Sequence, residues 1–249
     1  MTIKVAVLGA KGRMGSETVK AINAVSDLEL VAQLDLGDSL ETLKSTGAEV
    51  IVDFTHPDAV MANLEFAIKN GISVVVGTTG FDEKKLAQIK SWLAANPKVG
   101  ALIAPNFGLG AVLMMQFAAQ AAKYFESVEI VELHHPAKAD APSGTAARTA
   151  ELITAARKSV NKAAMPDATT SEIDGARGAK IGDVQIHSVR LRGLVAHQEV
   201  ILGDVGETLS IRHDSIDRTG FMPGVLLAIR KVGENPGLTF GLENYMDLN

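Results

Sequence analysis

The chain has 249 residues and a formal net charge of −5, with 24 Lys and Arg against 29 Asp and Glu. It contains no cysteine, which excludes disulfides, thiolate metal sites and a cysteine nucleophile. A mildly acidic chain without basic runs is a poor nucleic-acid binder. The long uncharged stretch 99–122 contains Pro105, Asn106 and two glutamines, whose amides would be costly at membrane depth. We therefore expect a soluble, cytoplasmic protein without nucleic-acid or membrane partners.

In the N-terminal part, short apolar runs alternate with helical segments. The apolar runs predict strands that are buried on both faces, at residues 3–8, 28–34, 50–54, 72–76 and 101–104. The intervening segments predict helices at residues 13–25, 58–69 and 82–95. Strands that alternate with helices indicate βαβ units and a parallel sheet.

The pattern changes after about residue 106. Predicted helices cover residues 110–125, 143–158 and 222–232, and predicted strands cover residues 127–133, 184–191, 195–202 and 208–213. The polar residues 162–180 are expected to form an extended surface segment. Clustered strands with short turns indicate a mixed or antiparallel sheet. We therefore expect an α/β protein with a Rossmann-like dinucleotide-binding domain, residues 1–106 and 218–249, and a smaller α+β substrate domain, residues 107–217.

A glycine-rich turn, residues 9–15 (GAKGRMG), follows the first predicted strand and opens the first predicted helix. Glycines let such a turn tighten and let the backbone approach a pyrophosphate, and the helix N-terminus attracts the anion. Asp35 ends the second strand, where an acid can bind a ribose 2′-hydroxyl. The alternative is a plain strand-to-helix turn and a surface acid. Loop, strand and acid together favour dinucleotide binding.

Two further segments end predicted strands. Residues 77–80 (GTTG) follow the fourth strand, and residues 104–107 (APNF) follow the fifth. Ligands of open α/β sheets bind beyond the carboxyl ends of the strands, so both segments are candidates for a binding site. Because Gly and Pro occur in loops of every kind, each segment could also be only a turn.

The densest group of reactive side chains lies in residues 132–145. His134, His135 and Lys138 share one loop and can place proton donors near a ligand. Residues 143–145 (SGT) open a predicted helix, whose amides can bind a carboxylate. The histidines and the lysine can also be structural or solvated, and Ser143 can be only an N-cap. Adjacent histidines point in different directions and have no acidic partner four residues away, so we expect no metal.

Five motifs taken together resemble one family: GAKGRMG, DFTHPD (53–58), GTTGF (77–81), APNF and HHPAKADAPSGTA (134–146). With the C-terminal stretch RTGFMPGVLLAIRKV, they make the chain similar to dihydrodipicolinate reductases over most of its length. The resemblance implies NAD(P)H-dependent reduction of the dehydrated form of 4-hydroxy-tetrahydrodipicolinate, a cyclic dicarboxylate imine, in diaminopimelate and lysine biosynthesis. It also implies a homotetramer built through the second domain.

The resemblance assigns roles to individual residues. His134 and Lys138 match the proton-transfer residues, His135 matches a substrate contact, and Gly144 and Thr145 match a carboxylate cradle. A hydride is then expected to add at C4 of the ring and a proton at C3, with Lys138 as donor and His134 donating or relaying. Together with Asp35, the residues expected to line NADH or NADPH are Gly9, Ala10, Lys11, Gly12, Arg13, Met14, Gly77, Thr78, Thr79, Ala104, Pro105, Asn106 and Phe107.

Two positions depart from the family pattern. Leu36 follows Asp35 where some members carry a basic residue for the 2′-phosphate, so a strict preference for NADPH is not expected, although Lys11 and Arg13 could partly substitute. Pro136 lies in the catalytic loop, where other residues are seen.

Two alternatives remain open. One is another NAD(P)-dependent oxidoreductase, such as a homoserine dehydrogenase; the thiol-acylating semialdehyde kind is excluded because cysteine is absent. The other is a cofactor-sensing regulatory protein, which would not need His134, Lys138 and the PSGT segment together.

Overall fold

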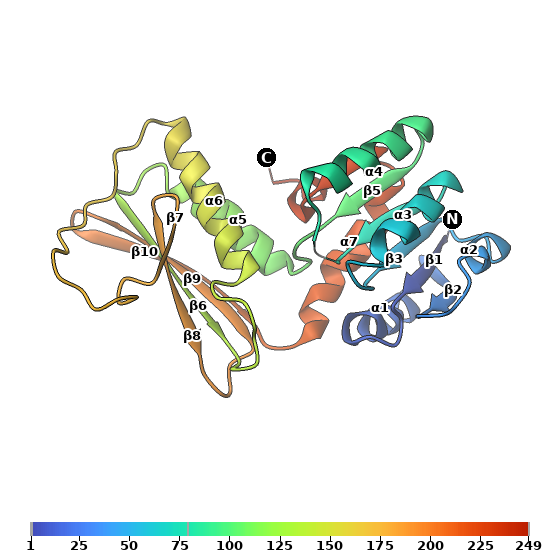
Figure 1. Cartoon of the computed structure of the whole chain (residues 1–249), viewed down its shortest axis with the longest axis horizontal. Helices are drawn as coiled ribbons and strands as arrows, with labels where there is room; N and C mark the ends of the chain where they lie inside the picture. Colours follow the sequence, from blue (N-terminus) through green and yellow to red (C-terminus); the bar gives the residue numbers. More distant parts are fainter. Residues whose placement is uncertain (1, 79, 249) are drawn as a thin grey trace. The chain divides into compact units, whose positions relative to one another are not determined.

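The computed structural model describes residues 2–78 and 80–248. The chain divides into two compact units (Figure 1). The first unit is formed by the residues up to Gly108 together with those from Arg218 onward, and the second is Leu109–Asp217. Because the chain leaves the first unit once and returns to it once, the second unit is an insertion in the first.

The first unit is built on a six-stranded sheet in the order β11-β5-β4-β3-β1-β2, and all neighbouring strands are parallel. This confirms the predicted parallel sheet. The edge strand β11 was not predicted, because its four residues follow a proline and include a glycine. The strands are β1 (Ile3–Leu8), β2 (Leu28–Leu34), β3 (Val50–Asp53), β4 (Ser73–Val76), β5 (Gly100–Ile103) and β11 (Gly237–Phe240).

Helices connect these strands, and short capping signals set their ends. Asp82 begins α4 because its side chain accepts a hydrogen bond from the amide of Lys85 at 2.8 Å. Pro223 lies in the first turn of α7, where a missing amide hydrogen costs nothing. The helices are α1 (Arg13–Asn23), α2 (Glu41–Ser45), α3 (Val60–Lys69), α4 (Glu83–Ala95) and α7 (Met222–Val232), with 3-10 turns η1 (Arg218–Phe221) and η2 (Leu242–Tyr245).

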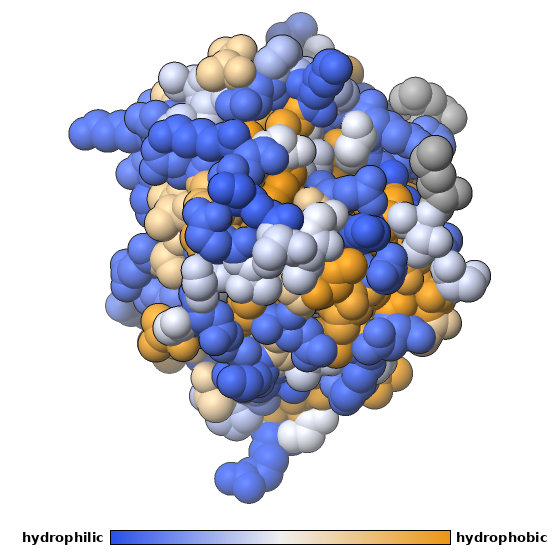
Figure 2. Space-filling model, turned by 90° about the vertical axis from the view of Figure 1, so that its right-hand side faces the viewer, coloured by the Kyte–Doolittle hydropathy of each residue, from blue (hydrophilic) through white to orange (hydrophobic). Residues whose placement is uncertain are grey.

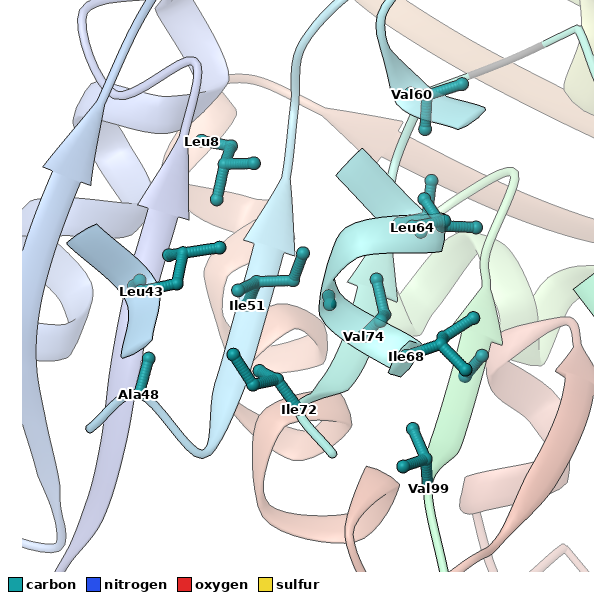
Figure 3. Packing of buried hydrophobic residues seen from close by; sticks show 14 of the residues in the cluster. Leu8, Leu43, Ala48, Ile51, Val60, Leu64, Ile68, Ile72, Val74 and Val99 are labelled. Carbon is teal, nitrogen blue, oxygen red and sulfur yellow. The ribbon is translucent and has the colours of Figure 1, made fainter. Parts of the chain in front are cut away.

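Both faces of this sheet are buried. Ile51 and Val74 lie in a cluster with Leu64 and Ile68 of α3, and all four are 0% exposed (Figure 3). Alternate strand residues point to the opposite face, where α1 and α7 pack on the sheet. Burying a side chain of this size stabilises the fold by about 1.5–3 kcal/mol. Leu64→Ala would therefore cost about 2–5 kcal/mol.

The second unit is built on a five-stranded sheet in the order β10-β9-β6-β8-β7. β6 and β8 are parallel, and the other neighbours are antiparallel, so the sheet is mixed, as predicted. The three-residue strand β7 lies at the end of the predicted extended segment and was missed. The strands are β6 (Ser127–His134), β7 (Ala179–Ile181), β8 (Val184–Arg190), β9 (Ala196–Asp204) and β10 (Glu207–Ser215).

Two helices, α5 (Leu109–Ala121) and α6 (Gly144–Ser159), lie side by side against this sheet (Figure 1). Along β6, fully buried side chains alternate with half-exposed ones, as expected of a sheet whose two faces differ. Ser143 caps α6, because its hydroxyl accepts a hydrogen bond from the amide of Ala146 at 3.2 Å. The end of β6 and the loop that follows it carry the predicted catalytic residues, His134 and Lys138.

Among residues 2–78 and 80–248, none of the helices combines the length and the apolar character needed to cross a bilayer. Figure 2 shows a face on which hydrophilic residues predominate and hydrophobic ones gather in smaller areas between them. The stretch 99–122 forms the buried strand β5, a turn and the whole of α5, as predicted.

Candidate active site

The predicted cofactor residues lie at the carboxyl ends of β1, β2, β4 and β5. These strands belong to the contiguous set β5-β4-β3-β1-β2, so the fold brings the glycine loop, Asp35 and the segments 77–78 and 104–107 to one edge of the sheet. Ligands of parallel α/β sheets bind at this edge. Thr79 lies outside the described residues.

The glycine loop has the geometry of an anion site. Gly9 has φ +77°, and a Cβ there would lie 2.7 Å from the carbonyl oxygen of Phe54, so only glycine fits. Gly12 caps α1 without any side-chain hydrogen bond, and the first turn of α1 carries no acidic residue. Because the N-cap residue has no side chain that could cap the helix, the first amides of α1 suit a pyrophosphate.

Asp35 lies directly against this loop. Its carboxylate accepts a hydrogen bond from the amide of Lys11, at 3.1 and 3.3 Å to its two oxygens. The amide of Asp35 donates to a carboxylate oxygen of Asp38 at 2.8 Å, which places a second acid at the end of β2. Sequence reasoning missed Asp38, although an acid three residues after another is typical of a turn. The side chain of Leu36, between them, is fully exposed.

An aromatic pair lies at the ends of β3 and β5. The rings of Phe54 and Phe107 have centroids 5.7 Å apart and meet edge to face at 70°. A Cβ on Gly77 would overlap the Phe54 ring, so the glycine is required for this packing. The sequence predicts Gly77 and Phe107 as cofactor residues. Phe54 belongs to the DFTHPD motif, but the sequence alone gave no role for it at this site.

A buried carboxylate supports the same edge. Asp53, which is 0% exposed, accepts hydrogen bonds from the amide of Thr55 at 2.9 Å and from its hydroxyl at 2.6 Å. It also accepts from Asn63 at 2.8 Å and from Thr78 at 3.4 Å. This network fixes the ends of β3 and β4. Its only sequence signal is an acid that ends an otherwise apolar strand.

In the second unit, a fully buried acid organises the predicted catalytic loop. Glu132 is 0% exposed, and Arg190 of β8 holds it through two hydrogen bonds of 2.8 Å. The same carboxylate accepts from Nδ1 of His134 at 2.5 Å and from the amide of Ser143 at 3.1 Å. Glu132 therefore joins β6, β8 and the start of α6. Sequence reasoning missed Glu132 and Arg190 as site residues, since they are 58 positions apart.

These contacts set the protonation of the pair. Burial raises the pKa of Glu132, but hydrogen bonds from Arg190, Ser188 and His134 outweigh it, so the pKa lies below 4.5. Burial lowers the pKa of His134 below 6.5, although Glu132 opposes this. His134 is therefore neutral near pH 7. An ionised carboxylate only accepts hydrogen bonds, so Nδ1 carries the hydrogen and Nε2 presents its lone pair.

Lys138 and Gly144 share a partner. Nζ of Lys138 lies 2.7 Å from one oxygen of Asp140, and the amide of Gly144 donates to the other at 3.3 Å. His135 is exposed in the same loop. The loop thus brings together His134, Lys138 and the start of α6, which includes Thr145.

The other histidines of the second unit are engaged elsewhere. His187 pairs with Glu129, and His197 pairs with Asp214, each at 2.7 Å, while His213 lies against Gly110. Across the described ranges, no three His, Asp or Glu side chains are grouped in a way that could hold a metal ion.

The first unit has a parallel sheet, a glycine loop before its first helix and an acid after its second strand. The second unit has a buried acid, a histidine and a lysine. These features together are typical of a nicotinamide-dependent oxidoreductase. The model of the N-terminal domain of dihydrodipicolinate reductase matches residues 3–107, and that of the C-terminal domain matches residues 110–246. The chain belongs to the dihydrodipicolinate reductase family, which confirms the resemblance.

Individual relatives agree with this. A 4-hydroxy-tetrahydrodipicolinate reductase from Nocardia farcinica is 62% identical and covers 100% of both chains. A solved structure of dipicolinate-bound dihydrodipicolinate reductase from Paenisporosarcina sp. TG-14 is 39% identical, with a TM-score of 0.88 over 98% of this chain and 99% of that one. An amine dehydrogenase from Mycobacterium smegmatis, 14% identical with a TM-score of 0.63 over 96% and 95%, shares the fold alone.

Proposed function

We propose that this chain catalyses the NAD(P)H-dependent reduction of the dehydrated form of 4-hydroxy-tetrahydrodipicolinate to tetrahydrodipicolinate, a step of diaminopimelate and lysine biosynthesis. The observation that carries the proposal is the loop 132–145. A buried, ionised Glu132 orients a neutral His134, and Lys138 and an amide at a helix start lie in the same loop. A cofactor-sensing protein would have no use for this arrangement.

The proton step belongs to this loop. A dinucleotide whose pyrophosphate is held by the glycine loop would supply, from its nicotinamide, the hydride that adds at C4 of the conjugated substrate. Electron density then moves toward the ring nitrogen, and the resulting enamine anion takes one proton at C3, which restores the C=N bond. Lys138 donates that proton, since its Nζ is a hydrogen-bond donor paired with Asp140, whereas Nε2 of the neutral His134 ring carries no hydrogen. His134 relays the proton or holds the donor through its lone pair.

The substrate carries two carboxylates, and the start of α6 suits one of them. The amides of Gly144 and Thr145 and the dipole of a 16-residue helix favour an anion. A Cβ on Gly144 would meet nothing within 4 Å, and its φ is not left-handed. The fold therefore does not demand glycine there, and the open space beside the amide is available to a ligand. His135, exposed in the same loop, contacts a carboxylate.

The protein uses NADH at least as readily as NADPH. Asp35 can accept a hydrogen bond from a 2′-hydroxyl, whereas Asp35 and Asp38 together repel a 2′-phosphate. Leu36 offers no compensating charge. Lys11 and Arg13 are both exposed at the glycine loop and keep NADPH usable.

We infer that the protein acts in the cytoplasm as a homotetramer assembled through the second unit. On β6, Val131 and Leu133 are half-exposed and point away from α5 and α6. On the same face, Arg212 bridges Glu199 and Asp214. Two apolar side chains beside charged pairs suit an isologous contact. Sedimentation should give about four times the mass of one chain, and a monomer at micromolar concentration would contradict the assembly.

A coupled assay tests the function. Freshly made product of the preceding synthase should cause loss of nicotinamide absorbance that depends on both this protein and the substrate. Pyridine-2,6-dicarboxylate, which keeps both carboxylates but has no easily reduced system, should compete without turnover. Pyridine-2-carboxylate should compete much more weakly, because half of the anion contacts are missing. Absence of substrate-dependent oxidation would refute the proposal.

A further inference from the structure

The carboxylate of Asp140 lies in the catalytic loop at the place where the substrate carboxylate is expected to bind. One oxygen of Asp140 lies 2.7 Å from Nζ of Lys138, and the other accepts from the amide of Gly144 at 3.3 Å. A single carboxylate therefore joins the proposed proton donor to the proposed carboxylate cradle. No acid lies in the first turn of α6 itself, so this helix start receives its negative charge from Asp140.

The backbone of Asp140 is anchored through Arg190, whereas its side chain is open to water and is held only by the partners that a ligand would take over. Nη2 of Arg190 donates to the carbonyl oxygen of Asp140 at 2.7 Å, and Arg190 is held in turn by the buried Glu132. The Asp140 side chain is 55% exposed. Water can therefore solvate the carboxylate after a rotation about its side-chain bonds, and the anchored loop need not move.

A second carboxylate cannot share these partners without cost. Two carboxylates on one amide and one ammonium repel each other, which disfavours two negative charges at the same place. The space beside Gly144 is open, since a Cβ there would meet nothing within 4 Å. A ligand can therefore enter beside the amide, and the conflict with Asp140 is electrostatic.

We propose that Asp140 is an internal competitor for the substrate carboxylate, which holds Lys138 and the Gly144 amide in the free protein and releases both when the dicarboxylate binds. This rests on the function proposed above. The exchange removes the fixed carboxylate partner of the Lys138 ammonium at the moment when the substrate arrives. Asp140 is thus a positioning residue that couples substrate binding to the freeing of the proton donor.

Calorimetric titration of pyridine-2,6-dicarboxylate, with NADH present, tests the exchange. Asp140→Asn should lower the Kd by about threefold or more, since the competing ion pair is exposed and such pairs are modest. Glu151→Gln is the matched control. Like Asp140→Asn, it removes one negative charge and one ion pair, here the pair with Arg148 within α6 at 3.1 Å. It should leave the Kd unchanged. An unchanged or higher Kd in Asp140→Asn would overturn the proposal.

The amide resonance of Gly144 gives an independent readout. Asp140→Asn should shift it in the free protein and leave it unchanged in the dicarboxylate complex, where Asp140 has already left. Shifts of equal size in both states would mean that Asp140 stays in place, against the proposal. If the unmodified protein neither binds the dicarboxylate nor turns over substrate, the proposed function fails and the exchange with it. If it does both and Asp140→Asn gains no affinity, the exchange alone fails.

Discussion

The carboxylate of Glu132 accepts a hydrogen bond from Nδ1 of His134, two residues further along the same strand, at 2.5 Å. Side chains two apart on a strand point to the same face. The register of the parallel pair β6–β8 puts Arg190 opposite His134, so the guanidinium can reach the same carboxylate. The tautomer of His134 therefore depends on a residue from another strand.

Glu132→Gln should lower kcat by about 10²-fold, because a neutral amide no longer fixes the hydrogen on Nδ1. Steady-state kinetics together with the imidazole nitrogen resonances of His134 measure both effects. Glu151→Gln, which removes an exposed acid from α6, should leave kcat unchanged. If the tautomer changes and kcat does not, His134 has no part in the proton step.

Lys138→Ala should lower kcat by about 10²–10⁴-fold, the range for losing a general acid. The affinity for NADH should stay within about twofold, because the glycine loop and Asp35 belong to the first unit. Kinetics and a cofactor titration separate the two quantities. Wild-type turnover in this variant would show that the proton comes from another group.

The pH dependence of stability reports on His134. Its pKa in the folded state is lowered below 6.5 by burial, so folding favours the neutral ring. This contribution is fully present above pH 6.5 and is lost as the pH falls from 6.5 through the lower folded pKa. Glu132 contributes in the same direction, but only below 4.5.

Between about pH 7 and pH 5, the free energy of unfolding should therefore decrease more steeply in the wild type than in His134→Gln. His213, whose pKa is lowered by burial too, is present in both proteins and cancels in the comparison. Denaturant titrations at several pH values give the slopes. Equal slopes would mean that His134 has the same pKa in both states.

Asp35→Ala should shift preference toward NADPH, raising the ratio of kcat/KM for NADPH over NADH by about tenfold, or 1.4 kcal/mol. The physical reason is the loss of a charge that repels the 2′-phosphate and of an acceptor for the 2′-hydroxyl. Parallel assays with the two cofactors measure the ratio. A wild type that uses NADH orders of magnitude less well than NADPH would contradict the role given to Asp35.

Much of the first unit follows from local sequence. Apolar runs of four to seven residues fix β1 to β5, and the Met222–Val232 helix begins and ends where its pattern predicts. The glycine loop could be located because its backbone conformation requires glycine, as the left-handed φ of Gly9 shows. By contrast, β7 and β11 have three and four residues and are held by neighbouring strands, so their own sequence carries little signal.

The network of the catalytic loop could be predicted only in part. The loop 134–145 was evident because its reactive residues are close in sequence. The partner of Glu132 is 58 residues away, and only the register of β6 against β8 brings Arg190 to it. Asp53 reads as an ordinary strand end, and its contact with Thr78 depends on the order of β3 and β4. These contacts were not predicted because they depend on which strands pair over long distances in the chain, and a single sequence carries no clear signal for such pairing.

The positions at which the hydride and the proton enter the product test the proposed reaction most directly. With cofactor deuterated at the transferable position, freshly made substrate and ordinary water, the product should carry one deuterium at C4. With ordinary cofactor in heavy water, deuterium should appear at C3 instead, as expected if Lys138 exchanges with solvent and then protonates the enamine. Magnetic resonance of the product locates each label. Deuterium from the cofactor on the carbon next to the ring nitrogen, or in no product at all, would contradict conjugate reduction by this protein.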